Sequence, residues 1–160
     1  MTNSVTWGKN EEVNGWTLLQ DPAFAEGYEG LVATVDGLRE KHPDTYQEKA
    51  TTKMLAAIEK LTKEVIPADP TSSMFDLGNT IGPEHRAWKR VKFLQQFRLF
   101  FRYDTKSKII IYGWMNDEKT KRAYGSKTDA YKVFRKRLAS EDPPTDWDDL
   151  IERAAPVDQQ

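Results

Sequence analysis

The chain contains no cysteine and only two histidines, His42 and His85, among its 160 residues. It therefore has no disulfide, no thiolate metal ligand and no cysteine nucleophile, and its isolated histidines do not resemble a zinc site. No hydrophobic run approaches the roughly 20 residues that a membrane-spanning helix needs, and the first residues lack a signal-peptide pattern. We therefore expect a cytoplasmic protein with no membrane segment and no cofactor.

Charge is distributed unevenly along the chain, although the formal net charge is only −1. Residues 83–139 contain 16 Lys and Arg but only five Asp and Glu, whereas the remaining residues contain eight Lys and Arg and 20 Asp and Glu. Two opposed blocks of charge favour a polyanion-binding face on an acidic body.

The first half of the chain is predicted to form a strand followed by a helical hairpin. Residues 14–19 resemble a short strand, and Asp21-Pro22 has the residues of a helix N-cap and first turn. Apolar residues at helical spacing continue to a break at residues 42–44, and a second helical stripe covers 46–65 and ends before Pro67. Residues 67–82 are rich in Pro, Gly, Ser, Asn and Thr, which predicts a long surface loop.

The second half is predicted to form three strands and a C-terminal helix. The first two strands lie near 90–93 and 97–103, and the third, at 108–115, is apolar on both sides and is therefore expected to be central. A helix over 127–138 follows. We expect residues 1–12 to be a disordered segment, 13–139 to be a single domain, and 140–160 to be an acidic tail with one short helix around Trp147.

Alternation along the first two strands places cations and one aromatic residue on a single face. Val91, Phe93, Leu99 and Phe101 are expected to pack on the helical hairpin. The opposite face carries Arg90, Lys92, Arg98, Phe100 and Arg102. Because buried cations without carboxylate partners are costly, we expect this face to meet solvent or an anion, and cations with aromatics suit RNA. A solvated face with scattered ion pairs remains the alternative.

Two kinds of phosphodiester chemistry are compatible with this face. Asp117, Glu118 and Asp129 could hold Mg²⁺, although Asp129 is also placed to cap the last helix. In metal-free cleavage the RNA 2′-hydroxyl attacks its own phosphate while arginines stabilise the phosphorane. Proton transfer would then use side chains other than histidine; the candidates are Lys92, Glu118, Tyr124 and Tyr131.

Several linked motifs resemble the YhaV-type toxins of bacterial type II toxin–antitoxin systems. They are Trp88-Lys-Arg-Val-Lys-Phe, Phe97-Arg-Leu-Phe-Phe-Arg-Tyr, Gly113-Trp-Met-Asn-Asp-Glu and Lys127-Thr-Asp-Ala-Tyr-Lys-Val-Phe, with Asn14-Gly-Trp and Pro143-Pro-Thr-Asp-Trp at the two ends. The resemblance covers roughly residues 13–150. It implies a RelE-like compact α+β fold with an N-terminal strand, an antiparallel helical hairpin on a curved, mainly antiparallel sheet, and a C-terminal helix.

The resemblance also implies a function and a set of site residues. It implies an RNA endonuclease that cuts mRNA on the ribosome and blocks translation. It also implies neutralisation by a PrlF-type antitoxin, a swapped-hairpin DNA-binding protein. The toxin would reach operator DNA only through the antitoxin complex, which represses its own operon. By resemblance Arg98 contacts the scissile phosphate, Arg122 and Tyr124 are the second arginine and the catalytic tyrosine, and Lys89, Arg90 and Lys92 form a basic strand.

Our leading hypothesis is a metal-independent mRNA interferase that uses no cofactor. The expected catalytic residues are Arg98, Arg122, Tyr124 and Glu118. The expected RNA-binding residues are Lys89, Arg90, Lys92, Phe100, Arg102, Asn116, Asp117, Lys127 and Tyr131. The alternative is a non-enzymatic RNA- or ribosome-binding module that uses the same face. A third hypothesis is a protein-interaction domain whose basic face receives an acidic antitoxin segment.

Overall fold

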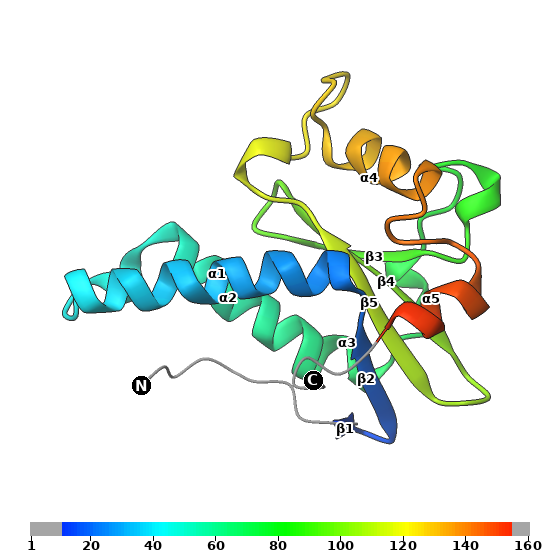
Figure 1. The fold of residues 1–160 in the computed structure, drawn as a ribbon, viewed down its shortest axis with the longest axis horizontal. Coiled ribbons are helices and arrows are strands. Elements are labelled where there is room, and N and C mark those ends of the chain that lie inside the picture. The colour runs from blue at the N-terminus through cyan, green and yellow to red at the C-terminus, as the bar shows by residue number, and fades with distance from the viewer. Residues whose placement is uncertain (1–10, 155–160) are drawn as a thin grey trace.

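The computed structural model describes residues 11–154, which form an α+β fold around one five-stranded sheet (Figure 1). The strands are β1 (Glu12–Val13), β2 (Trp16–Gln20), β3 (Lys89–Phe93), β4 (Phe97–Asp104) and β5 (Ile109–Met115). Their order is β1-β2-β5-β4-β3, and β2 and β5 are parallel while the other neighbours are antiparallel. The predicted α+β class, the mainly antiparallel sheet and the central position of β5 are confirmed. Of the predicted N-terminal segment, residues 1–10 lie outside the described residues, and Glu12 pairs with Thr17.

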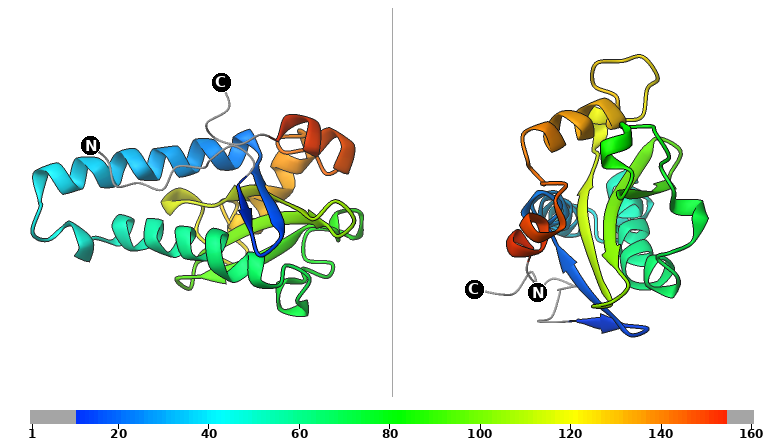
Figure 2. Two further views of the ribbon diagram at one scale, coloured as in Figure 1. Left: turned by 90° about the horizontal axis from the view of Figure 1, so that it is seen from below. Right: turned by 90° about the vertical axis from the view of Figure 1, so that its right-hand side faces the viewer.

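The predicted helical hairpin is present and extends well beyond the sheet (Figure 2). Helix α1 (Pro22–Lys41) begins at the expected cap, since the Asp21 side chain accepts a hydrogen bond from the Ala23 amide. Helix α2 (Ala50–Lys60) follows a 3₁₀ turn (Tyr46–Glu48). A π-helical turn (Leu61–Val65) and the short α3 (Ile66–Ala68) continue the second helix without a break.

The predicted end of this helix before Pro67 is wrong, because the helix passes through the proline. Pro67 lacks the N–H that would bond to the Thr62 carbonyl in the i→i−5 pattern of a π turn. The Tyr112 hydroxyl of β5 donates to that carbonyl at 2.6 Å instead. A buried side chain from the sheet therefore satisfies the acceptor that the proline leaves open.

One face of the sheet packs on the hairpin as predicted. Val91, Phe93, Leu99 and Phe101 join buried residues of α1 and α2 in one hydrophobic cluster. At one point β4 and β5 are out of register, because Phe100 pairs with Trp114 while Phe101 pairs with Tyr112, and Gly113 is the extra residue. A side chain at Gly113 would meet the Trp88 ring, since a Cβ there lies 2.4 Å from Cζ3.

The expectation that the opposite face is open to solvent or an anion is wrong for most of its length. Helices α4 (Ala130–Ala139) and α5 (Trp147–Arg153) cover it and build a second core (Figure 2). Phe100 is completely buried, with its ring centroid 4.0 Å from that of Phe134. The alternation correctly indicated which residues share this face. However, aromatic packing such as that of Phe100 on Phe134 buries the face and does not expose it to a ligand.

Two smaller features, a loop and a helix start, also differ from the prediction. Residues 67–82 were expected to form a surface loop, yet Phe75, Leu77 and Ile81 are buried and short 3₁₀ turns (Ser73–Phe75 and Pro83–His85) shape the path to β3. Helix α4 begins at Ala130 instead of residue 127, with Asp129 as its cap. The predicted short helix near Trp147 is confirmed as α5. No helix within residues 11–154 combines the length and apolar character needed to cross a membrane.

Candidate active site

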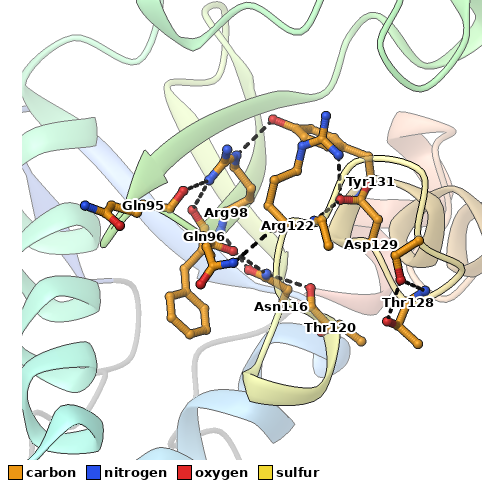
Figure 3. Close-up of polar contacts among 12 residues, drawn as sticks. Gln95, Gln96, Arg98, Asn116, Thr120, Arg122, Thr128, Asp129 and Tyr131 are labelled. Carbon is orange, nitrogen blue, oxygen red and sulfur yellow. Dashed lines mark hydrogen bonds and ion pairs between the residues drawn. The ribbon is translucent and has the colours of Figure 1, made fainter.

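The centre of the candidate site is the Tyr131 hydroxyl, which accepts hydrogen bonds from two arginines. Nε of Arg90 on β3 and Nε of Arg98 on β4 each lie 3.0 Å from Tyr131 Oη. Tyr131 belongs to the first turn of α4, so the two bonds join the sheet to the covering helix. Figure 3 shows the bond from Arg98. Because the oxygen already accepts two bonds, its own proton remains to be donated.

Arg98 is held rigidly although it is a cation. It is only 7% exposed, and its Nη1 donates to the carbonyls of Gln95 and Phe97 at 2.8 and 2.9 Å. Its Nη2 has no hydrogen-bond partner among residues 11–154 and is the donor left for a ligand. The Gln95 carbonyl belongs to the β3–β4 turn, where Leu94 and Gln95 both adopt positive φ angles, and the Phe97 carbonyl belongs to the first residue of β4.

Arg122 approaches the same tyrosine from the segment that follows β5. Its guanidinium carbon lies 4.8 Å from the centre of the Tyr131 ring, and its Nη1 donates to Asp129 Oδ1 at 2.6 Å (Figure 3). Asp129 also accepts from the amides of Ala123 and Tyr131. Burial by itself raises the pKa of Asp129, but the bonds from Arg122 and these amides outweigh it and hold the pKa below its ordinary value. Arg122 is therefore anchored by a stably ionised carboxylate.

Asn116 fixes the backbone beneath these arginines and does not face a ligand. It is 1% exposed, its Oδ1 accepts from the Arg98 amide at 2.7 Å, and its Nδ2 donates to the carbonyls of Gln96 and Thr120. The Arg122 amide also donates to the Gln96 carbonyl at 2.9 Å. These bonds tie the segment after β5 to the β3–β4 turn, and so set the spacing between Arg98 and Arg122.

A pocket of about 230 Å³ opens beside the arginines at the start of α4. Arg122, Tyr131 and Thr80 line it, together with two exposed cations of α4, Lys132 and Arg135. Tyr124 also lines the pocket and is 93% exposed, with its ring centre 5.5 Å from the Arg122 guanidinium carbon. The arrangement combines anchored cations, free cations and an exposed aromatic ring, which is the composition of a single-stranded nucleic-acid site.

Glu118 and Asp117 are not brought to this cluster. Both line a different pocket, of about 580 Å³, between α1 and the 3₁₀ turn at Glu118–Thr120. Glu118 pairs with Lys121 at 3.0 Å, and Asp117 caps the turn through the amide of Lys119. Within the part of the chain that the structure describes, no three acidic or histidine side chains gather where a metal ion would fit. The Mg²⁺ alternative based on these two residues and Asp129 is therefore not supported by their placement.

The remaining predicted RNA contacts occupy different environments. Phe100 is fully buried and offers no surface to a base. Arg102 is covered by the C-terminal segment, where it bonds to the Thr145 carbonyl and lies 5.4 Å from the Trp147 ring centre, and burial lowers its pKa. Lys89 pairs with Asp76 at 3.0 Å.

Two predicted lysines remain exposed near the cluster. Lys92 lies on β3 directly opposite Arg98, and Lys127 lies in the loop before α4. Neither makes an ion pair among the described residues. Both therefore remain available to an anionic ligand, unlike Lys89.

Sequence reasoning underestimated Tyr131 and missed the partner of Arg122. Tyr131 was expected as an RNA contact and as one of four candidates for proton transfer, but only the convergence of β3, β4 and α4 gives its hydroxyl two arginine partners. Asp129 was recognised as a helix cap, but the same carboxylate also binds Arg122. The signal available was its position seven residues after Arg122, just before the helical pattern begins.

Comparison with known proteins identifies the family of the chain. Residues 18–155 match the model of the YhaV toxin family, described as toxins with endonuclease activity of toxin–antitoxin systems. The chain belongs to this family.

Curated relatives of this toxin family match over most of their length. Toxin YhaV of Escherichia coli O6:H1 is 49% identical over 144 residues, which cover 89% of this chain and 94% of the relative. Ribonuclease toxin YhaV of Escherichia coli K12 is 50% identical over 142 residues, covering 88% and 92%. No solved structure gives a significant match. Membership of the family implies that this chain has an antitoxin partner and endonuclease activity. In the same chain, three arginines converge at Tyr131.

Proposed function

We propose that the protein is a toxin that cleaves RNA at the Arg98–Arg122–Tyr131 cluster, without a metal ion, by attack of the 2′-hydroxyl on the adjacent phosphate. Its family is defined by endonuclease activity, and one relative is named a ribonuclease. The single observation that carries the assignment is the convergence of three arginines on one buried phenol. Such a cluster suits the extra negative charge of a pentavalent phosphorane.

The chemistry requires two proton transfers and one bond exchange. A base takes the 2′-hydroxyl proton, the 2′-oxygen bonds to phosphorus, and the bond from phosphorus to the 5′-oxygen breaks. The departing oxygen then needs a proton. Tyr131 is our candidate acid, because its hydroxyl oxygen accepts from Arg90 and Arg98 and its proton has no acceptor in the cluster. The two N–H donors remain in place to bind the oxygen after the proton has left.

The arginines take different parts in this scheme. Arg122 and the free Nη2 of Arg98 contact the phosphate oxygens, whereas Arg90 holds Tyr131. Tyr124 is 93% exposed and makes no hydrogen bond among the described residues, so we assign it to base stacking. Glu118, which lies in the other pocket, has no part in this scheme.

The partners that we propose for the toxin go beyond what its family membership shows. We propose mRNA on the ribosome as the substrate, a PrlF-type antitoxin as the neutralising partner, and repression of the operon by the complex of the two. The resemblance of the motifs at residues 88–93, 97–103, 113–118 and 127–134 supports these proposals.

The test is cleavage of a defined mRNA by antitoxin-free protein in EDTA, with and without ribosomes, followed by mapping of the product ends. A 2′,3′-cyclic phosphate and a 5′-hydroxyl are the expected products. Cleavage that occurs only after Mg²⁺ is added would contradict the metal-free mechanism. Salt-sensitive binding without any cleavage would favour the alternative of a binding module.

Variants of the cluster test the individual roles. Arg122→Ala is expected to lower kcat by about 10²- to 10³-fold, as when an oxyanion donor is lost. Tyr131→Phe should lower kcat by about 10²-fold or more if the tyrosine is the acid. A substrate with sulfur in place of the bridging 5′-oxygen has a leaving group that does not need protonation. On this substrate Tyr131→Phe should recover most of its activity while Arg122→Ala does not, and an equal defect on both substrates would exclude the acid role.

A further inference from the structure

The outer side of α4 carries cations that have no partner within the protein. Lys132, Arg135 and Lys136 are exposed, and their spacing of three and four residues places them on one side of the helix. None of the three makes a hydrogen bond or an ion pair through its side chain among residues 11–154. Arg137, on another side of α4, instead pairs with Asp142 at 3.1 Å. No residue from Ala130 to Ala139 is acidic, so the positive charge of this side is uncompensated along the helix.

Two of these cations belong to the pocket beside the candidate active site. Lys132 and Arg135 line the cavity of about 230 Å³ together with Arg122 and Tyr131. The pocket therefore adjoins the groups assigned to the scissile phosphate. Its two free cations, Lys132 and Arg135, lie where the pocket extends away from those groups. The exposed ring of Tyr124 forms part of the same wall.

We propose that this pocket and the outer side of α4 bind the nucleotide next to the cleaved bond and the phosphate beyond it. The inference rests on the proposed ribonuclease function and adds a subsite to it. Lys132 and Arg135 contact the flanking phosphate, and Tyr124 stacks on the base. An acidic protein segment would satisfy the cations, but it has no use for an exposed aromatic ring beside them, whereas a single RNA strand uses both.

Because the subsite lies away from the reacting atoms, its loss should change substrate binding and not the chemical step. Loss of Lys132 and Arg135 should weaken binding of substrate and transition state equally, so KM rises while kcat changes little. Loss of the contact with one phosphate on a single strand reduces the slope of log K against log salt by about 0.7. Between 50 and 200 mM salt, the affinity of the double variant should then fall about 2.6-fold less than that of the parent.

The experiment measures binding of an RNA oligonucleotide whose mapped cleavage site carries a 2′-deoxy residue, which removes the nucleophile. Binding is followed by fluorescence anisotropy across a salt series for the full-length parent and K132A/R135A. The matched control is K53A/K60A, which removes two exposed lysines of α2 that make no ion pair among the described residues. Oligonucleotides shortened by one nucleotide at a time from each end identify the flank that occupies the subsite.

The expected result is a reduced salt slope in K132A/R135A and a parental slope in the control. The parent should also lose affinity when one flank is shortened, while K132A/R135A should be insensitive to the same shortening. A parental slope in K132A/R135A overturns the subsite, even if Arg122→Ala still abolishes cleavage and so upholds the proposed function. Retained RNA binding with lost neutralisation by the antitoxin would assign the surface to an acidic protein partner and also overturn it. Failure of the parent to bind or cleave RNA would refute the proposed function itself.

Discussion

Asp129 links the stability of the fold to the proposed activity, because one buried carboxylate serves two purposes. Its Oδ2 accepts the Tyr131 amide and caps α4, while its Oδ1 accepts Nη1 of Arg122 and the Ala123 amide. The side chain is only 4% exposed, whereas that of Arg122 is 27% exposed. In Asp129→Asn the amide oxygen can still accept from the Tyr131 amide. Its NH₂ group, which is a donor, then faces the Arg122 and Ala123 donors. Asp129→Ala removes every bond.

The magnitudes follow from these contacts. Loss of an N-cap costs about 1 kcal/mol. A hydrogen bond to a charged group contributes about 1.5–3 kcal/mol, and we take the lower end because Arg122 regains water. We therefore expect Asp129→Ala to lower the free energy of unfolding by about 2–3 kcal/mol and Tm by about 4–12 °C, and Asp129→Asn to cost about half as much. Both variants release Arg122, so both should lower kcat, by about 10²-fold if the guanidinium moves by 1 Å.

The pH dependence has a definite sign. Because the pKa of Asp129 is lowered in the folded protein, the carboxylate stabilises the fold above its unfolded pKa of about 4, and this contribution is lost as the pH falls through the folded pKa. Urea denaturation should therefore show a large difference between parent and Asp129→Asn at pH 7 that narrows as the pH falls below about 4. A parental kcat in Asp129→Asn would refute the idea that Asp129 positions a catalytic arginine.

Two further substitutions test the packing around the site. Gly113→Ala should lower the free energy of unfolding by about 1–3 kcal/mol, measured by urea denaturation, because its Cβ would lie 2.4 Å from the Trp88 ring; a neutral effect would show that Trp88 moves freely. Arg153→Ala should lower Tm more at pH 8 than at pH 5, because it removes the 2.8 Å partner of the buried Asp21, whose pKa is already raised by burial and whose protonation relieves the loss. An equal loss at both pH values would show that the protonation of Asp21 does not change between them.

Local signals in the sequence were sufficient wherever a feature depends on neighbouring residues. Asp21-Pro22 predicted the start of α1, and alternation along β4 correctly placed Leu99 and Phe101 on the hairpin side. Asp129 was foreseen as a cap. Each of these depends on spacing or on hydrogen bonds within a few residues, and tertiary packing did not override them.

The same signals failed where distant segments cover one another. Alternation grouped Phe100 with the cations of β3 and β4, but it contains no information about what packs on that face. The residues that join Phe100 in the second core, among them Trp88, Trp114 and Phe134, come from separate parts of the chain. The apolar character of β5 on both sides was the available signal that both faces of the sheet are buried.

Composition misled the prediction for residues 67–82 for a related reason. The Pro, Gly, Ser, Asn and Thr of this segment are typical of a loop, and it does lack long helices and strands. Three apolar side chains, Phe75, Leu77 and Ile81, nevertheless anchor it to the two cores. The anchored segment then supplies Thr80 to the pocket and the Asp76 carbonyl to Arg90 at 2.9 Å.

The second core and the candidate active site are parts of one arrangement. Phe134 stacks on Phe100 and Trp114 with centroid distances of 4.0 and 5.6 Å, and the edge of Tyr131 meets Phe100 at 5.8 Å. This stack fixes the first turn of α4 over β4, and so holds the Tyr131 hydroxyl between Arg90 and Arg98. Close-packed interiors resist small displacements, so a site at the edge of the stack keeps its geometry before substrate arrives. Under the proposed function, the aromatic residues that bury the sheet face serve RNA cleavage indirectly, because they position the arginines and the phenol that remain at its rim.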